Sequence, residues 1–196
     1  MEKRNYQLEM ETLLTNHPKV LLHACCAPCS SAVLERLAPL AEITLFFYNP
    51  NIQPELEYRF RLEELQRLLR EMPLPGTIGL LEGAYEPERF LAFASTMADE
   101  PERGKRCQLC IRLRLEEAAK AAIAMGADFF ATTLTVSPHK DAEYINTAGF
   151  AVAQEYGIPY LPSDFKKKEG YKRSIELSRE YNLYRQNFCG CAASRR

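Results

Sequence analysis

Seven cysteines set the chemistry that this 196-residue chain can perform, and they fall into three sets. The sets are Cys25, Cys26 and Cys29; Cys107 and Cys110; and Cys189 and Cys191. Cysteines that serve only as small hydrophobic side chains would be scattered along strands and helices. In a reducing compartment, a clustered pattern indicates metal binding or redox chemistry instead.

Cys25 and Cys26 are adjacent in the sequence. On a regular strand their side chains would point to opposite faces, whereas an irregular loop lets both turn toward one metal centre. With Cys29 and the Cys107/Cys110 pair, five thiols are expected near one point. A tetrahedral zinc site needs only four ligands, and an iron–sulfur cluster is likewise held by four thiolates. The residues favour a cluster over zinc and leave one thiol to bind a second metal or to stay free.

Cys189 and Cys191 are separated by one glycine, so a disulfide between them would close a small strained ring. Strained disulfides are easily reduced and are typically regulatory or catalytic. The pair is therefore predicted to be redox-active. The alternative is a free surface pair near a flexible chain end.

Strands and helices are expected to alternate along the chain. Strands are predicted over 19–24, 43–48, 77–81, 128–134 and 158–161. Helices are predicted from about 30 to 40, with Ser30 and Ser31 as cap residues, and over 55–72, 87–97, 111–125, 141–156 and 171–181. This alternation predicts an α/β fold, a Rossmann-like (HUP-like) doubly wound parallel sheet of about five strands with helices on both faces. The expected strand order is 3-2-1-4-5.

Residues 1–18 are predicted to form an N-terminal helical extension. Residues 19–196 are predicted to be a single Rossmann-like catalytic domain with a cysteine-bearing C-terminal tail. In an open parallel sheet, ligands bind beyond the carboxyl ends of the strands, where the strand order reverses. Cys25, Asn49, Thr133 and Asp164 follow four different strands, so the chemistry is placed at this edge.

The composition favours a cytoplasmic protein. The net charge is −1, and no apolar run reaches the roughly 20 residues of a membrane helix. The start of the chain lacks the apolar region of a secretory signal. From Lys166 to Arg196, nine Lys and Arg stand against three acidic residues. Such a run is usually a solvated face, and it also suits contacts with nucleic-acid phosphates.

Five motifs together resemble the QueH type of epoxyqueuosine reductase. They lie at 22–30, 48–52, 106–110, 132–138 and 184–191, in the family's order, and the resemblance covers about residues 19–194. It implies the last step of queuosine synthesis, the two-electron reduction of epoxyqueuosine to queuosine at the wobble position of tRNA. The implied tRNAs carry GUN anticodons and are those for tyrosine, histidine, aspartate and asparagine.

The resemblance also implies cofactors and site residues. It implies a 4Fe–4S cluster and a nearby mononuclear iron, with no cobalamin. The implied cluster ligands are Cys25, Cys26, Cys107 and Cys110. Cys189 and Cys191 carry over as the catalytic redox pair, which an external electron donor would reset. Either Cys29 or Asp164, the latter also expected to be catalytic, would ligate the second iron.

Two other function classes remain open. An ATP-dependent tRNA-modifying enzyme of the same fold needs a Gly/Ser-rich phosphate loop after the first strand. The loop here reads Cys-Cys-Ala-Pro-Cys-Ser-Ser and contains no glycine, which disfavours that class. A zinc-binding tRNA- or RNA-binding module is the other alternative, and iron and sulfide analysis would distinguish it.

Overall fold

A parallel sheet of four strands forms the centre of the computed structural model, which describes residues 4–194. The strands are β1 (Lys19–His23), β2 (Glu42–Phe47), β3 (Gly79–Glu82) and β4 (Phe129–Thr132), in the order β3-β2-β1-β4. Leu22 of β1 is in register with Leu45 of β2 and Ala131 of β4. The predicted α/β class, parallel sheet and order of these four strands are confirmed.

The expected fifth strand is reduced to a single bridge between Phe130 and Tyr160. Two backbone hydrogen bonds join the segments, from Phe130 N to Pro159 O and from Leu161 N to Phe130 O. Pro159 and Pro162 flank this short run, and proline cannot donate a ladder hydrogen bond. The prediction of five strands is therefore wrong by one, although the segment lies beside β4 as the order 3-2-1-4-5 required.

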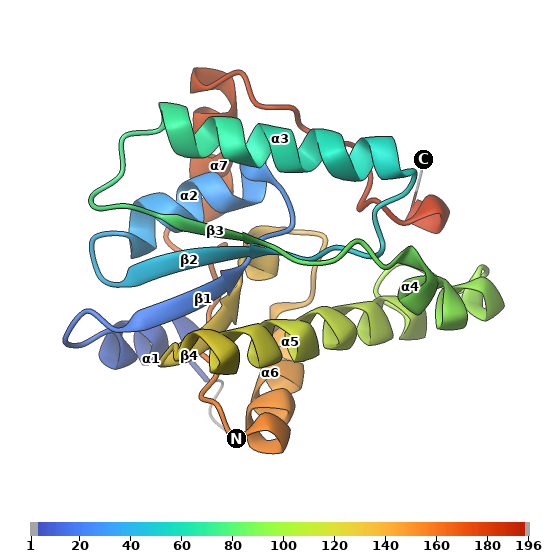
Figure 1. Cartoon of the computed structure of the whole chain (residues 1–196), viewed down its shortest axis with the longest axis horizontal. Coiled ribbons are helices and arrows are strands. Elements are labelled where there is room, and N and C mark those ends of the chain that lie inside the picture. Colours follow the sequence, from blue (N-terminus) through green and yellow to red (C-terminus); the bar gives the residue numbers. More distant parts are fainter. Residues whose placement is uncertain (1–3, 195–196) are drawn as a thin grey trace.

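Helices cover both faces of the sheet (Figure 1). One face carries α2 (Ala27–Leu37), α3 (Glu55–Glu71) and α7 (Gly170–Glu180), and the other carries α5 (Lys105–Met125) and α6 (Ala142–Tyr156). A shorter helix, α4 (Pro87–Ala94), continues into a 3₁₀ turn at Ser95–Met97. Further 3₁₀ turns lie at Thr133–Val136 and Ala192–Ser194.

Side chains of β1 alternate between two apolar clusters, as a strand buried on both faces requires. Val20 and Leu22 belong to the cluster beneath α2 and α3, whereas Leu21 belongs to the cluster beneath α5 and α6. The helix α1 (Tyr6–Leu13) adds Met10 to the first cluster. Residues 1–3 of the predicted extension and 195–196 of the tail lie outside the described residues, and the predicted boundary at 18/19 remains a prediction.

Two helices begin earlier than the sequence suggested. Ser30 and Ser31 do not cap α2, because the helix starts at Ala27 and their hydroxyls donate to the carbonyls of Cys26, the N-cap residue, and Pro28. Pro28 permits this, since a first-turn residue needs no hydrogen bond from its backbone nitrogen. Similarly, α5 starts at Lys105 rather than near 111. Each early start places cysteines inside the first turns of a helix.

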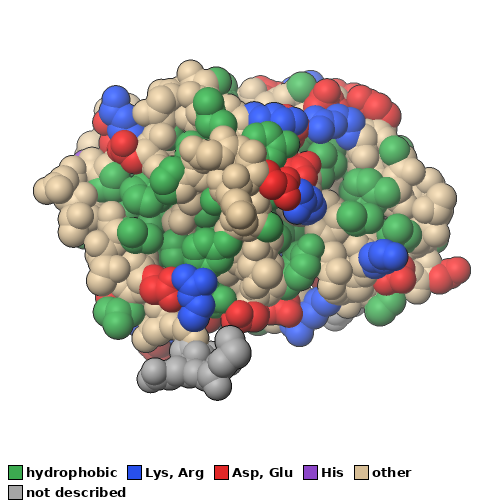
Figure 2. Space-filling view, turned by 90° about the horizontal axis from the view of Figure 1, so that it is seen from below, with side chains coloured by type: hydrophobic (Ala, Val, Ile, Leu, Met, Phe, Trp, Pro, Cys, Tyr) green, Lys and Arg blue, Asp and Glu red, His purple; other side chains and the backbone are tan. Residues whose placement is uncertain are grey.

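The face made by α5 and α6 carries mixed charge. Figure 2 looks onto the molecule from below relative to Figure 1, and on it Lys and Arg side chains lie beside Asp and Glu side chains. Arg112 of α5, for example, pairs with Glu155 of α6 at 2.6 Å. No helix within residues 4–194 is long and apolar enough to cross a membrane.

Candidate metal and thiol site

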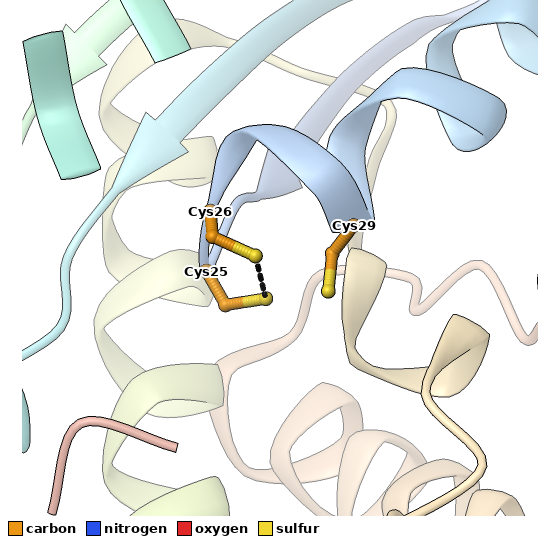
Figure 3. A group of neighbouring side chains, drawn as sticks. All are labelled: Cys25, Cys26 and Cys29. Carbon is orange, nitrogen blue, oxygen red and sulfur yellow. Dashed lines mark hydrogen bonds between the residues drawn. The ribbon is translucent and has the colours of Figure 1, made fainter. Parts of the chain in front are cut away.

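Three thiols meet where β1 passes into α2. Cys25 follows β1, Cys26 is the N-cap residue of α2, and Cys29 lies in the first turn of that helix. The Sγ atoms of the three lie within 4.8 Å of one another, and those of Cys25 and Cys26 are 3.7 Å apart. Figure 3 shows the three sulfurs pointing into the same space. Adjacent Cys25 and Cys26 thus turn their sulfurs toward one point.

The start of α2 explains why these sulfurs meet. Cys26 has an extended backbone, with φ −173° and ψ 166°, so the chain turns there from the strand into the helix. The first amides of a helix have no partner within it, and the helix dipole gives its N-terminus a partial positive charge. That end of α2 therefore favours thiolates.

The three thiols also interact electrostatically. Hydrogen bonds from Cys25 and Cys29 hold the pKa of Cys26 well below its usual value. The same pairing with Cys26 raises the pKa of Cys25 to about 11, and hydrogen bonding to Cys25 and Cys26 raises that of Cys29 well above its usual value. Cys26 is therefore the thiol of the three that ionises most readily, and a bound cation would favour the thiolate form of all three.

The donor set fits a thiophilic metal. Two thiolates on one tetrahedral ion, each about 2.3 Å from it, lie roughly 3.8 Å apart, close to the 3.7 Å between Cys25 and Cys26. An all-sulfur set suits iron–sulfur clusters and soft metals rather than magnesium or calcium. The three cysteines are thus a site that can hold a metal group.

A cavity of about 200 Å³ opens beside these thiols. Its wall combines the three cysteines with His139 and Lys140 from the loop after β4 and with residues 185–189 of the C-terminal segment. Behind the wall, Thr133 Oγ1 donates a hydrogen bond to Cys25 Sγ at 3.6 Å. The cavity lies at the carboxyl edge of the sheet, where the sequence placed the chemistry.

The other four cysteines line an adjoining, smaller cavity. Cys107 and Cys110 are three residues apart on α5, so they share one side of the helix. Both lie outside the group of three thiols, so three of the five expected thiols meet at one point. Cys189 lines both cavities and therefore connects the two thiol groups. All seven cysteines are free thiols, and Cys189 and Cys191 form no disulfide.

Comparison with known proteins identifies the family. A family model for epoxyqueuosine reductase QueH matches residues 20–196. The chain belongs to the QueH family. It is 41% identical to the epoxyqueuosine reductase QueH of Staphylococcus epidermidis, over 97% of this chain and 84% of that protein. It is also 41% identical to that of Streptococcus pyogenes, over 97% and 78%, and 35% identical to that of Thermotoga maritima, over 89% of each chain.

Two cations in this QueH family member were not predicted from the sequence. Arg114 is buried, lines both cavities, and donates from Nε to the carbonyl of Cys110 at 3.2 Å. Burial works against its charge, but the neighbouring cysteines raise its pKa. Lys140 Nζ lies 3.3 Å from Cys189 Sγ. Arg114 lies seven residues after Cys107 and four after Cys110, and this helical spacing indicates that the three side chains share one side of α5. Lys140 lies in a loop, so no periodic pattern in the sequence indicated its position.

Asp164 lies away from the three clustered thiols. It lines a separate, more open hollow, and its Oδ1 accepts no hydrogen bond, with Lys166 Nζ at 3.6 Å. Its role in iron binding or catalysis remains a prediction. His23, by contrast, is fully buried between Thr132 and the carbonyl of Tyr48, and burial lowers its pKa to about 4. It is neutral and holds the ends of three strands together.

Proposed function

We propose that this chain is an epoxyqueuosine reductase that converts epoxyqueuosine in tRNA to queuosine, the last step of queuosine biosynthesis. The family membership and the names of the relatives support the reaction and its tRNA substrate. The observation that carries the proposal is the meeting of Cys25, Cys26 and Cys29 beside a cavity at the carboxyl edge of the sheet. The epoxide oxygen leaves as water, which consumes two electrons and two protons.

The proposed resident groups are a 4Fe–4S cluster and an additional mononuclear iron. The residues proposed to hold the cluster are Cys25, Cys26, Cys107 and Cys110, with Cys29 or Asp164 on the additional iron. Cys25 and Cys26 meet at the end of β1, and Cys107 and Cys110 line the adjoining cavity, so the four thiolates that such a cluster needs are available on neighbouring walls. When bound, these groups would supply single-electron transfer and a Lewis acid for the epoxide oxygen.

Cys189 and Cys191 are proposed to be the redox pair. Two thiols that form one disulfide release two electrons and two protons, which is the amount that removal of the epoxide oxygen consumes. The position of Cys189 on both cavities supports this role, because it borders the space beside Cys25 as well as the space that contains Cys191. An external electron donor then restores the dithiol.

The proposed substrates are the tRNAs with GUN anticodons, which read tyrosine, histidine, aspartate and asparagine codons, in the cytoplasm. A hollow of about 850 Å³ adjoins the thiol cavity and shares Pro138 and Lys140 with it. Arg103, Lys166 and Lys167 also line the hollow, so cations are available beside the site for backbone phosphates.

The decisive experiment uses protein purified without oxygen. Its iron, acid-labile sulfide and zinc contents are measured, and the protein is then incubated with tRNA carrying epoxyqueuosine and a low-potential reductant. Nucleoside mass spectrometry should show queuosine replacing epoxyqueuosine. A colourless protein with one zinc, no iron and no conversion would instead support the zinc-binding RNA module.

A further inference from the structure

We propose that the two C-terminal thiols have different roles. Cys189 is the reactive thiolate that exchanges with external thiols, Cys191 is the resolving thiol, and Lys140 is the positioning residue that makes them different. The inference deepens the proposed function, since it rests on these cysteines being the redox pair.

The contact between Lys140 and Cys189 is direct. The ammonium Nζ donates to Cys189 Sγ at 3.3 Å, within hydrogen-bonding range for sulfur. The backbone carbonyl of Lys140 also accepts a hydrogen bond from Lys166 Nζ at 3.3 Å. Burial disfavours its charge, yet the neighbouring Cys189 raises its pKa, so the pair is most stable as ammonium and thiolate.

Two neighbouring cations favour a negative charge at the Cys189 sulfur. Burial opposes ionisation, but Lys140 and Arg114 outweigh it and lower the pKa of Cys189. The remaining titratable or charged side chains that line the two cavities are Arg61, Glu102, His139, Tyr171, Cys25, Cys26, Cys29, Arg106, Cys107, Cys110, Cys191 and Arg185. Of the cations, Arg61 donates to the carbonyl of Cys189, so it also holds the backbone on which the thiolate sits.

Cys191 has a different environment. It is buried in an apolar cluster with Phe90, Ala94 and Cys110, and it lines only the smaller cavity. An enclosed thiol is a poor target and a poor nucleophile for external reagents, because access limits the rate of exchange. It remains only two residues from Cys189 and can reach a mixed disulfide formed there.

These roles define the resetting steps. An external thiolate attacks Cys189 Sγ of the disulfide, the bond between the two cysteines breaks, and Cys191 leaves as a thiolate and takes up a proton. A second external thiolate attacks the external sulfur of the mixed disulfide, and Cys189 leaves as a thiolate beside Lys140. Two external thiols thus become one external disulfide, and the chain regains its dithiol.

The experiment compares the reactivity of Cys189 and Cys191 in the anaerobically purified protein, without tRNA. Pulses of iodoacetamide between pH 5 and 10, followed by peptide mass spectrometry, give separate alkylation rates for Cys189 and Cys191. At pH 7 Cys189 should react at least ten-fold faster. In a second arm, an aromatic disulfide should accumulate as a mixed disulfide on Cys189 in Cys191→Ser, and should react slowly with Cys191 in Cys189→Ser.

The role of Lys140 is tested by Lys140→Met, Lys140→Gln and Lys140→Arg. In the neutral variants, the midpoint of the plot of Cys189 alkylation rate against pH should shift to higher pH by roughly one unit or more, because an opposite charge at this distance is lost. Lys140→Arg should restore the profile, and Lys166→Met, which removes a neighbouring ammonium, should leave it unchanged.

Equal rates for the two cysteines, or a faster Cys191, would overturn the assignment of roles. An unchanged profile in a folded neutral variant of Lys140 would overturn the positioning role. Should Lys140→Met not fold, the Lys140→Gln and Lys140→Arg profiles decide the same question. Because no substrate is present, absent reductase activity alongside the expected asymmetry would count against the proposed function alone.

Discussion

Arg61 of α3 donates a hydrogen bond from Nη1 to the backbone carbonyl of Cys189 at 3.3 Å. Its Nη2 donates to the carbonyl of Phe188 at 3.3 Å, and its Nε bonds to Glu57 at 2.7 Å. The side chain of Arg61 is only 2% exposed, so water cannot replace these bonds. One buried guanidinium therefore ties the C-terminal cysteine segment to α3.

Replacing Arg61 with methionine should loosen this segment. The change removes both carbonyl bonds and leaves a part-buried Glu57 without its cation, so we expect a loss of about 3 kcal/mol in the free energy of unfolding. Urea unfolding measures this loss, and alkylation of Cys189 should become faster in the native state. The control is Arg59→Met on the same helix, where exposed ion pairs with Glu55 and Glu82 are lost and the free energy of unfolding should change far less. Equal effects of the two variants would show that Arg61 does not anchor the segment.

Gly190 should not tolerate alanine. Its φ is +109°, and a Cβ atom there would lie 2.7 Å from Cγ1 of Ile52, whose neighbour Gln53 donates from N to the carbonyl of Gly190. The chain must shift, so Gly190→Ala should change the ratio of Cys189 to Cys191 alkylation. Gly157→Ala is the matched control, because Gly157 also has positive φ but no atom within 4 Å of its Cβ position. It should lower stability by about 1 kcal/mol without altering that ratio.

Local signals predicted most of the fold. Apolar runs separated by amphipathic helices give an alternating pattern, and right-handed crossovers then fix the order β3-β2-β1-β4. The two main differences between the predicted and observed elements both involve proline, which lengthened a helix in one case and shortened a strand in the other. Pro28 extended α2 backward past Ser30, whereas Pro159 reduced a strand to one bridge. In both cases a hydrogen-bonding consequence of proline outweighed the propensity of the surrounding residues.

The candidate site was predictable in part. The adjacency of Cys25 and Cys26 was enough to suggest that they meet, because a loop between strand and helix is short. The ammonium of Lys140 beside Cys189 was not predictable, because the two residues are 49 positions apart and lie outside regular helices and strands. Contacts between distant loops depend on tertiary packing, which leaves no periodic pattern in a single sequence.

Serine variants of the different cysteine sets should differ in their iron and sulfide contents. Serine substitutions should remove both iron and acid-labile sulfide at the proposed cluster ligands Cys25, Cys26, Cys107 and Cys110. Cys29→Ser should lower iron more than sulfide if Cys29 holds the additional iron, and Cys191→Ser should leave both contents unchanged. Iron and sulfide are measured on the same anaerobic preparations. Full iron in two or more of the four ligand variants would contradict the proposed cluster.

The basic residues after the fifth-strand segment do not form one surface. Lys172 pairs with Glu169, and Arg173 pairs with Glu35 and Glu176, so acidic partners already offset these charges. Lys168 pairs with Glu11. Lys166, Lys167 and Lys168 line the hollow that shares Lys140 with the thiol cavity, whereas Lys172 and Arg173 do not. Lys166 also has Asp164 Oδ1 at 3.6 Å. The structure thus divides these five cations, which lie close together in the sequence, between the hollow and the surface outside it.

This division predicts which cations contact tRNA. Lys166→Gln combined with Lys167→Gln should weaken tRNA binding and reduce the slope of log affinity against log salt by about 1–2, because each lost phosphate contact releases roughly one counterion fewer. Lys172→Gln combined with Arg173→Gln removes the same formal charge from paired positions and should change the slope by less than about 0.5. Titrations at several salt concentrations measure both variants. The two pairs carry the same net charge, so equal slopes would mean that long-range attraction, rather than contact in the hollow, governs tRNA binding.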